Sequence, residues 1–233
     1  MKVTLTHYTE NPLRTIEEAA CNCYDSKISN DGRIAKACYK SGHTSVFEFC
    51  DFTFHIEGLS RAALAQLTRH RVGCSFAVRS QRYCSEFNGD WVTPKSIERN
   101  KEAVVLYNLT MRKLRETYDE LCDMGISNED ARFVLPNAWC TTLELKMTGR
   151  ALIHFCNERL CTHSQWEIRE LAQKMKKEIL SNGSCASFAQ FLVPKCMTGV
   201  VHYCTERKGC GLCPPPEELN KLILTELTED EKD

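Results

Sequence analysis

The chain has 233 residues, with 30 Lys and Arg against 31 Asp and Glu, and a formal net charge of −1. Hydrophobic residues make up 42% and charged residues 26%, which is ordinary for a folded protein of one large domain or two small ones. The balanced charge excludes a protein that recruits nucleic acid or an anionic membrane through its overall field. Any anion must therefore be bound by a local cluster.

The first residues contain no apolar run of the length that a signal peptide needs, and no stretch is apolar enough to span a membrane. We therefore expect a cytoplasmic protein that is not bound to a membrane. The fifteen cysteines should then be thiols and not disulfides. Five of them lie singly within apolar patterns, and we expect these to be small buried side chains: Cys38, Cys50, Cys122, Cys140 and Cys156.

The first part of the chain predicts strands and short helices. A strand is expected at residues 2–8, followed by helices at 14–23 and 31–41, the second closed by Gly42 in a left-handed cap. The segment 45–58 should be a half-buried strand, because its apolar and polar residues alternate. Its expected inner face holds Cys50, Phe52, Phe54 and Ile56, and its outer face holds Asp51, Thr53 and His55. A helix should then run from about Ser60 to Arg69.

The remainder is mostly helical in pattern. Residues 96–124 have helical periodicity, Ser127 with Asp130 resembles a helix cap, and Pro136 should end that helix. A strand at 141–147 and helices at 148–162 and 164–181 complete the pattern. The expected class is α/β, of the mixed α+β kind, with an antiparallel-rich sheet and flanking helices. We expect a single domain over residues 1–195 and a short, Cys-rich, acidic tail at 196–233.

The stretch RHRVGCSFAVRSQRY, residues 69–83, carries four arginines, which are Arg69, Arg71, Arg79 and Arg82. Arginine presents a fixed planar fork of donors, so several of them beside Ser80 and Gln66 could form a cradle for phosphate or carboxylate. A surface cluster paired with acidic residues is the alternative. The small apolar run between the arginines fits a segment that enters the protein better than a solvated loop.

The stretch TGRALIHFCNERLCTHSQWEIRE, residues 148–170, predicts an amphipathic helix. Its polar stripe holds Arg150, His154, Asn157, Glu158 and Cys161, and its apolar stripe holds Leu152, Phe155 and Cys156. Arg159 lies on the apolar side, where a guanidinium needs a buried anion or a salt-bridge partner. A ligand anion and a core ion pair both remain open as explanations.

The stretch CMTGVVHYCTERKGCGLC, residues 196–213, is rich in soft ligands. Zinc could be bound there by Cys196, His202, Cys204, Cys210 and Cys213. Only Cys210 and Cys213 have metal-ligand spacing, and no second matched pair is present. Reduced thiols are therefore favoured over a zinc site, and we expect no metal.

Several motifs, in order along residues 20–170, resemble one family. They are HTSVFEF, QLTRHR followed by SQRY, ARFVLP, and R-x-x-x-H-x-x-x-x-R-x-x-x-H-S-Q-W-E-I-R. In this combination the sequence resembles the flavin-dependent thymidylate synthases. The resemblance implies a homotetramer of mixed α/β subunits and a reaction in which NADPH reduces FAD, methylenetetrahydrofolate supplies one carbon, and dUMP becomes dTMP. No cysteine nucleophile is then obligatory, although Cys74 and Cys84 lie near the arginines.

The resemblance also implies roles for individual residues. Those expected on the flavin side are His43, Ser45, Arg69, His70, Arg71, Thr148, Arg150, His154 and His163. Those expected to bind dUMP are Gln66, Arg69, Ser80, Gln81, Arg82, Arg132 and Arg159. Catalytic roles fall to Ser80 and to Arg159, which in the family lies near the pyrimidine and favours its ionisation at N3.

The sequence departs from the family pattern in four places. Eight residues, Val72 to Arg79, separate Arg71 from Ser80, one more than the usual spacing. Val78, Phe49 and Thr148 stand where members usually have an acidic residue, a histidine and an asparagine, respectively. The alternatives left open are an FAD- and NADPH-binding flavoprotein that has lost methylation, a nucleic-acid-binding module, and an interaction protein held together by zinc.

Overall fold

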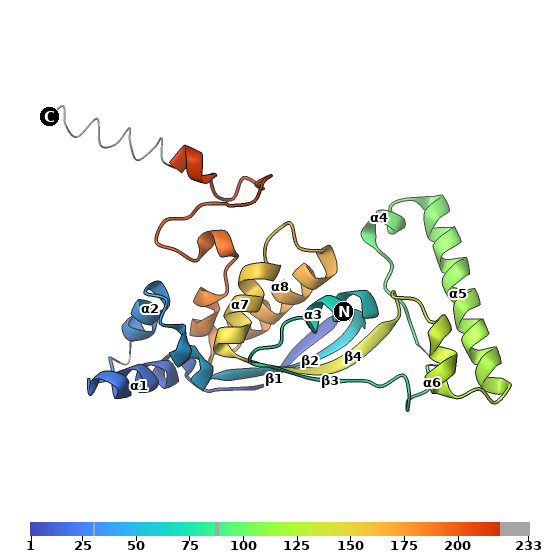
Figure 1. Ribbon diagram of the computed structural model, residues 1–233, viewed down its shortest axis with the longest axis horizontal. Helices are drawn as coiled ribbons and strands as arrows, with labels where there is room; N and C mark the ends of the chain where they lie inside the picture. Colours follow the sequence, from blue (N-terminus) through green and yellow to red (C-terminus); the bar gives the residue numbers. More distant parts are fainter. Residues whose placement is uncertain (30, 87–88, 220–233) are drawn as a thin grey trace. The chain divides into compact units, whose positions relative to one another are not determined.

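The structure is a computed structural model that describes residues 1–29, 31–86 and 89–219 (Figure 1). The chain forms two compact units, each built from two separate segments. The sheet unit comprises Met1–His7 and Thr53–Lys146. The helical unit comprises Tyr8–Phe52 and Met147–Asp233.

A four-stranded antiparallel sheet, most of which lies in the sheet unit, has the order β1-β2-β4-β3. Its strands are β1 (Lys2–Tyr8), β2 (Asp51–Ser60), β3 (Cys74–Val78) and β4 (Cys140–Thr148). The predicted alternation of β2 is confirmed, since Phe54 and Ile56 are fully buried while His55 on the opposite face hydrogen-bonds Glu144 of β4. The expected mixed α+β class is confirmed.

One prediction near these strands was wrong, and one strand was missed. The strand expected from residue 45 begins at Asp51, because Thr44–Phe49 forms a 3-10 helix, η1. The adjacent residues Val46 and Phe47 are both buried, which a strand that exposes every second side chain cannot achieve. The small apolar run after Arg71 is the edge strand β3, which the sequence did not predict as a strand.

The sheet unit also contains helices. They are α3 (Arg61–Leu67), α4 (Lys95–Glu98), α5 (Lys101–Asp123), α6 (Asn128–Ala131) and the 3-10 turn η2 (Arg132–Val134). Ser60 caps α3 by accepting the Ala63 N–H at 3.0 Å, and this helix ends two residues before Arg69. Ser127 stands at the expected cap of α6, but its hydroxyl donates to the Asp130 carboxylate and does not accept a backbone N–H.

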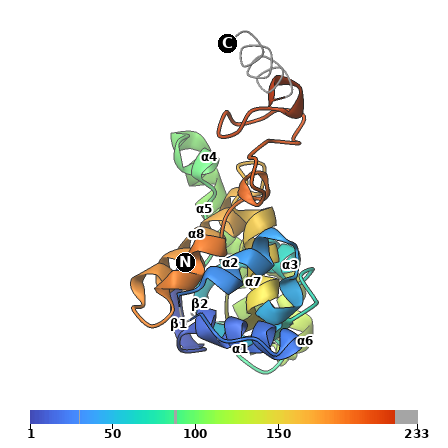
Figure 2. The same cartoon turned by 90° about the vertical axis from the view of Figure 1, so that its left-hand side faces the viewer.

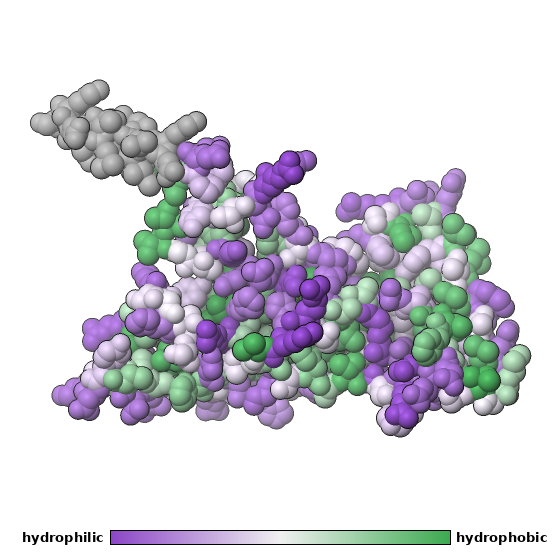
Figure 3. All heavy atoms as spheres, viewed as in Figure 1, coloured by the Kyte–Doolittle hydropathy of each residue, from purple (hydrophilic) through white to green (hydrophobic). Residues whose placement is uncertain are grey.

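The long helix α5 has an exposed apolar face. Val105, Leu106 and Leu109 are 58%, 69% and 60% exposed. Figure 3 shows hydrophobic side chains gathered over the region that α5 occupies in Figure 1. Single exposed apolar residues are normal on a protein surface, whereas a group of them on one helix is a candidate contact surface.

The helical unit is built from helices and short 3-10 turns around an aromatic core. The helices are α1 (Pro12–Tyr24), α2 (Arg33–Lys40), α7 (Gly149–Arg159) and α8 (Trp166–Ser181), and the turns besides η1 are η3 (Ala186–Phe191) and η4 (Lys195–Met197). Helices α1 and α2 pack together (Figure 2). Gly42 has the predicted left-handed conformation, with φ of 75°. The rings of Phe52 and Phe188 stack with centroids 4.7 Å apart, and those of Phe47 and Phe191 lie 5.1 Å apart.

Gly149 lets α7 begin against this core. A Cβ at that position would lie 2.8 Å from the Phe47 carbonyl oxygen and 2.6 Å from the Cys50 sulfur. The start of α7 is therefore held close to η1, and only glycine fits there. Helix α7 ends at Arg159, three residues before the predicted end.

All fifteen cysteines are thiols. Burial was predicted correctly for Cys50 and Cys156, and it raises the pKa of both thiols to about 12. The prediction was wrong for Cys38, Cys122 and Cys140, which are half-buried. Within the described residues, no helix combines the length and the apolar character that a membrane crossing requires.

Candidate functional site

The segment after α3 presents two unpaired arginines. The backbone continues as a hydrogen-bonded turn, with the Arg69 N–H donating to Gln66 O at 3.3 Å. Gln66 is half-buried, His70 is buried, and Arg69 and Arg71 are exposed. The side chains of Arg69 and Arg71 make no hydrogen bond or ion pair with any residue that the structure describes. Both guanidinium groups are therefore available to an anion.

A tight turn follows β3 and holds the predicted phosphate loop. Ser80 Oγ accepts the Arg82 N–H at 3.2 Å, and Ser80 O accepts the Cys84 N–H at 3.0 Å. The side-chain nitrogen of Gln81 is buried without a hydrogen-bond partner in the described part of the chain. A buried donor of this kind is costly unless a ligand oxygen satisfies it.

Arg82 and Arg132, which sequence places fifty residues apart, meet at one glutamate. Arg82 Nε lies 2.7 Å from Glu129 Oε2, and Arg132 Nε donates to the Glu129 carbonyl oxygen at 2.9 Å. The Arg82 and Glu129 side chains are 51% and 45% exposed, so water screens the pair. Glu129 thus links the turn that carries Ser80 and Arg82 to Arg132, through its carboxylate and its backbone carbonyl oxygen.

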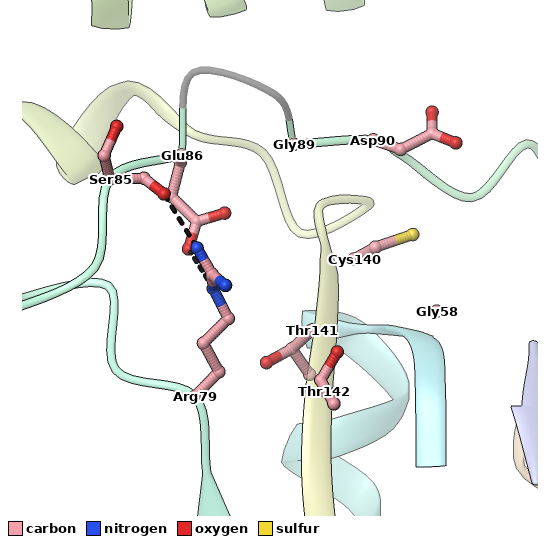
Figure 4. A pocket seen from close by; sticks show the side chains of 9 residues that line it. All are labelled: Gly58, Arg79, Ser85, Glu86, Gly89, Asp90, Cys140, Thr141 and Thr142. Atoms are coloured by element: carbon pink, nitrogen blue, oxygen red, sulfur yellow. Dashed lines mark hydrogen bonds and ion pairs between the residues drawn. The ribbon is translucent and has the colours of Figure 1, made fainter.

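Arg79 points elsewhere, although it belongs to the same cluster in the sequence. Its Nη2 donates to Ser85 O at 2.8 Å, and its Nε lies 3.5 Å from Glu86 Oε1 (Figure 4). Glu86 is buried, and its other oxygen accepts the Trp139 indole N–H at 2.7 Å. This pair lines a cavity of about 470 Å³. Arg79 is therefore paired with an acidic residue of the protein itself. This agrees with the alternative explanation of the arginine cluster, in which its members pair with acidic residues.

Arg61 is a further arginine that the sequence did not single out. Its Nη2 donates to Arg79 O at 3.1 Å, and its Nε is buried without a partner among the described residues. Burial lowers its pKa, Glu86 opposes that effect, and Arg132 and Arg79 add to it. Three residues of this region were not identified from the sequence: Arg61, Glu86 and Glu129. Only Arg61 had a signal in the sequence, because it is a charged residue directly after a buried strand.

The helical unit brings η1 and the start of α7 together. Thr148 caps α7, since its hydroxyl accepts the Ala151 N–H at 3.3 Å. Arg150 Nη1 lies 2.7 Å from Glu48 Oε1, which belongs to η1. His43 and Ser45 are exposed at the beginning of the same turn. Two groups of predicted flavin-side residues, far apart in sequence, therefore lie near one another.

Further along α7 the predicted stripes are confirmed. Leu152, Phe155 and Cys156 are buried, while His154 is exposed. Arg159, the last residue of the helix, is half-buried. His163 follows in the loop before α8, and its Nε2 donates to Lys208 O.

The predicted site residues divide between the two units. The sheet unit carries Gln66, Arg69, His70, Arg71, Ser80, Gln81, Arg82 and Arg132. The helical unit carries His43, Ser45, Thr148, Arg150, His154, Arg159 and His163. Across residues 1–29, 31–86 and 89–219, no group of three His, Cys, Asp or Glu side chains is arranged to hold a metal ion.

Comparison with known proteins identifies one family model, two relatives and one solved structure. The family model described as thymidylate synthase complementing protein matches residues 4–182. A flavin-dependent thymidylate synthase of Geobacter sulfurreducens is 39% identical over 236 residues, covering 96% of this chain and 98% of that protein. Another, from Pyrococcus abyssi, is 37% identical and covers 92% of each chain. A crystal structure of thymidylate synthase X from Helicobacter pylori with FAD and dUMP superposes with a TM-score of 0.66 at 25% identity, covering 82% of this chain and 99% of that one.

Proposed function

Because this chain belongs to the flavin-dependent thymidylate synthase family, we propose that it converts dUMP to dTMP, with FAD as its cofactor. In the proposed reaction NADPH reduces the flavin and methylenetetrahydrofolate donates the one-carbon unit. The main structural support is the turn at Ser80–Arg82: Arg82 and Arg132 both contact Glu129, and the Gln81 amide nitrogen is buried without a partner among the described residues.

The turn suits the phosphate of a nucleotide monophosphate. A dianion can accept hydrogen bonds from Arg82 and Arg132 together, and the Gln81 amide nitrogen lacks an acceptor. Arg69 lies close in sequence to Gln66, and both are proposed to contact the nucleotide. Ser80 already stabilises the turn by accepting the Arg82 N–H, so its first role is to orient the loop.

The residues proposed for FAD also fit an anionic dinucleotide. Arg69 and Arg71 are unpaired cations among the described residues, and His70 beside them is buried. The second group is His43, Ser45, Thr148, Arg150, His154 and His163 in the helical unit, which offers hydroxyl, imidazole and guanidinium donors. When bound, FAD supplies the hydride chemistry, and the protein supplies orientation and charge.

Arg159 is the proposed catalytic cation. A guanidinium beside the pyrimidine stabilises the anion formed on loss of the N3 proton, which raises the electron density at C5 for attack on the one-carbon donor. The side chain is half-buried at the end of a helix whose neighbouring face is apolar, so solvent screens its charge only in part.

Other parts of the proposal are less closely tied to the site. The homotetramer that the resemblance implies would cover the exposed apolar face of α5.

We place the synthase domain at residues 1–195 and a separate tail at 196–233, in keeping with the family match that ends at 182. Residues 220–233, the acidic end of that tail, lie outside the described residues. The setting proposed for the reaction is the cytoplasm.

The visible absorption spectrum of the purified protein, followed by dUMP-dependent NADPH oxidation with methylenetetrahydrofolate, tests the proposal. A flavin spectrum and dTMP product are expected. Flavin binding with NADPH oxidation but no dTMP would favour the flavoprotein that has lost methylation. A protein that neither takes up FAD nor oxidises NADPH would contradict both.

Arg159→Gln then tests the catalytic assignment. We expect kcat to fall on the order of 100-fold or more while FAD stays bound, because the charge acts on the developing pyrimidine anion. Arg33→Gln is the matched control, since Arg33 is a 76% exposed arginine of the same unit that pairs only with Asp31. Equal rates in the two variants would remove Arg159 from the mechanism.

A further inference from the structure

The segment 196–213, which the proposed reaction does not use, folds back on itself and gathers thiols. The Cys204 N–H donates to Pro214 O at 2.8 Å, and the Cys213 thiol donates to Cys196 O at 3.6 Å. Cys204 and Cys213 are buried, at 9% and 7% exposed, and Cys196 is half-buried. Three thiols distant in sequence are therefore held inside one small loop structure.

This loop packs against the end of α7 and the turn that follows. A cavity of about 90 Å³ is lined there by Cys161, Cys196, Cys204, Cys210 and His163, among others. His163 Nε2 donates to Lys208 O, which fixes the segment just before Cys210. Gly211, with φ of 84°, allows the chain to turn between Cys210 and Cys213.

Cys210 and Cys213 differ in exposure, as the attacking and resolving thiols of a reactive pair do. Cys210 is fully exposed, and hydrogen bonds from the Leu212 backbone N–H and then from the Thr162 side chain lower its pKa. Cys213 is buried, and its thiol donates a hydrogen bond to Cys196 O. Its neighbour Cys196 has a pKa raised to about 11, chiefly by burial and then by Cys213 and Cys204.

We propose that Cys210 and Cys213 form a redox-active dithiol that reacts with small-molecule disulfides of the glutathione class. The exposed Cys210 thiolate attacks one sulfur of the disulfide, whose S–S bond breaks, and the first glutathione leaves as a thiolate that takes a proton from water. Cys213 then loses its proton to water, attacks the Cys210 sulfur and displaces the second glutathione. Two protein thiols are oxidised to one disulfide, and one glutathione disulfide is reduced to two thiols.

A soft metal ion bound by the same cysteines is the competing explanation. Among the described residues no three side chains are arranged as metal ligands, whereas a dithiol needs only two. Cys210 is exposed whereas Cys213 is buried, and this difference fits an attacking and a resolving thiol better than equivalent metal ligands.

Oxidised glutathione is the probe for the experiment, applied to the reduced full-length protein. After partial reaction, the remaining thiols are alkylated and the peptides are identified by mass spectrometry. We expect a disulfide-linked peptide joining Cys210 and Cys213, with loss of two hydrogens. Cys213→Ser should trap one glutathionyl group on Cys210, and Cys210→Ser should slow the reaction of the segment about tenfold or more.

Cys23→Ser is the matched control, because Cys23 is exposed and its thiol only donates to a backbone carbonyl, Ala19 O. Its removal should leave the reaction of Cys210 unchanged. Equal rates for Cys210 and Cys23, or no trapped adduct in a Cys213→Ser protein with an unchanged unfolding midpoint, would overturn the proposal. It would likewise be overturned by about one zinc per chain that must be chelated before Cys210 reacts.

Discussion

Arg79 and Arg82 lie three residues apart in one loop, and each meets a single glutamate, yet the two pairs differ in what they can do. Glu86 has a side chain 5% exposed and also accepts the Trp139 indole N–H, so Arg79, itself 46% exposed, is anchored to a buried carboxylate. Glu129 is 45% exposed, and its pair with Arg82 is surrounded by water. The burial of the glutamate, and not of the arginine, therefore separates an arginine that stabilises the fold from one that can exchange its partner for a ligand.

Removing each glutamate in turn tests whether burial distinguishes the two ion pairs. Glu86→Ala should lower the free energy of unfolding by about 2–4 kcal/mol, because it leaves a buried indole N–H without its acceptor, removes the ion pair of Arg79 and opens a cavity. Glu129→Ala should cost less than about 1 kcal/mol. Denaturant unfolding at a fixed protein concentration measures both values. Equal losses would show that burial does not distinguish the two pairs.

A smaller effect is expected on ligand affinity. Glu129→Gln removes the charge that competes for Arg82, so dUMP should bind up to about fivefold more tightly to the FAD-loaded protein. Calorimetric titration of dUMP measures the change. The control is Glu116→Gln, which neutralises a 59% exposed carboxylate of α5 that pairs with Lys113. Weaker dUMP binding in the Glu129 variant would mean that Glu129 orients Arg82 for the nucleotide and does not compete with it.

The smallest effect is expected at the cysteines that flank the arginines. Cys74→Ala and Cys84→Ala should each retain measurable dTMP formation, because the flavin route needs no cysteine nucleophile. Cys74 is half-buried, and burial raises the pKa of its thiol, which makes it a poor nucleophile at neutral pH. Product assays of both FAD-loaded variants test this. Complete loss of dTMP in either one, with FAD still bound, would assign the thiol a chemical role.

Local patterns predicted the fold well where one face of an element is buried. The alternation of β2, the stripes of α7 and the turn at Gly42 follow from side-chain periodicity and from the freedom of glycine, which act over a few residues. The 3-10 turn η1 and the edge strand β3 were missed, because adjacent buried residues and a short strand between arginines leave no clear period.

The sequence predicted the arginines of the candidate site that lie in motifs, but not the residues that the fold places opposite them. Motifs named the arginines, since each sits in a recognisable stretch of sequence. They did not name Glu86, Glu129 or Arg61, whose importance depends on which residue the fold places opposite them. Glu129 meets Arg82 across 47 positions, and Glu86 meets Trp139 across 53. No local spacing carries that information, so only the tertiary structure shows which arginine is already paired.

The shared glutamate has a consequence for the chemistry that the turn selects. Any anion that binds Arg82 must first displace the Glu129 carboxylate, which is tethered in place and never diffuses away. A chloride or acetate ion brings the same single charge as Glu129 and gains little by the exchange, whereas a phosphate dianion brings twice that charge and more acceptor oxygens. On the proposed function, the turn would remain selective for a nucleotide phosphate in the presence of abundant monovalent anions.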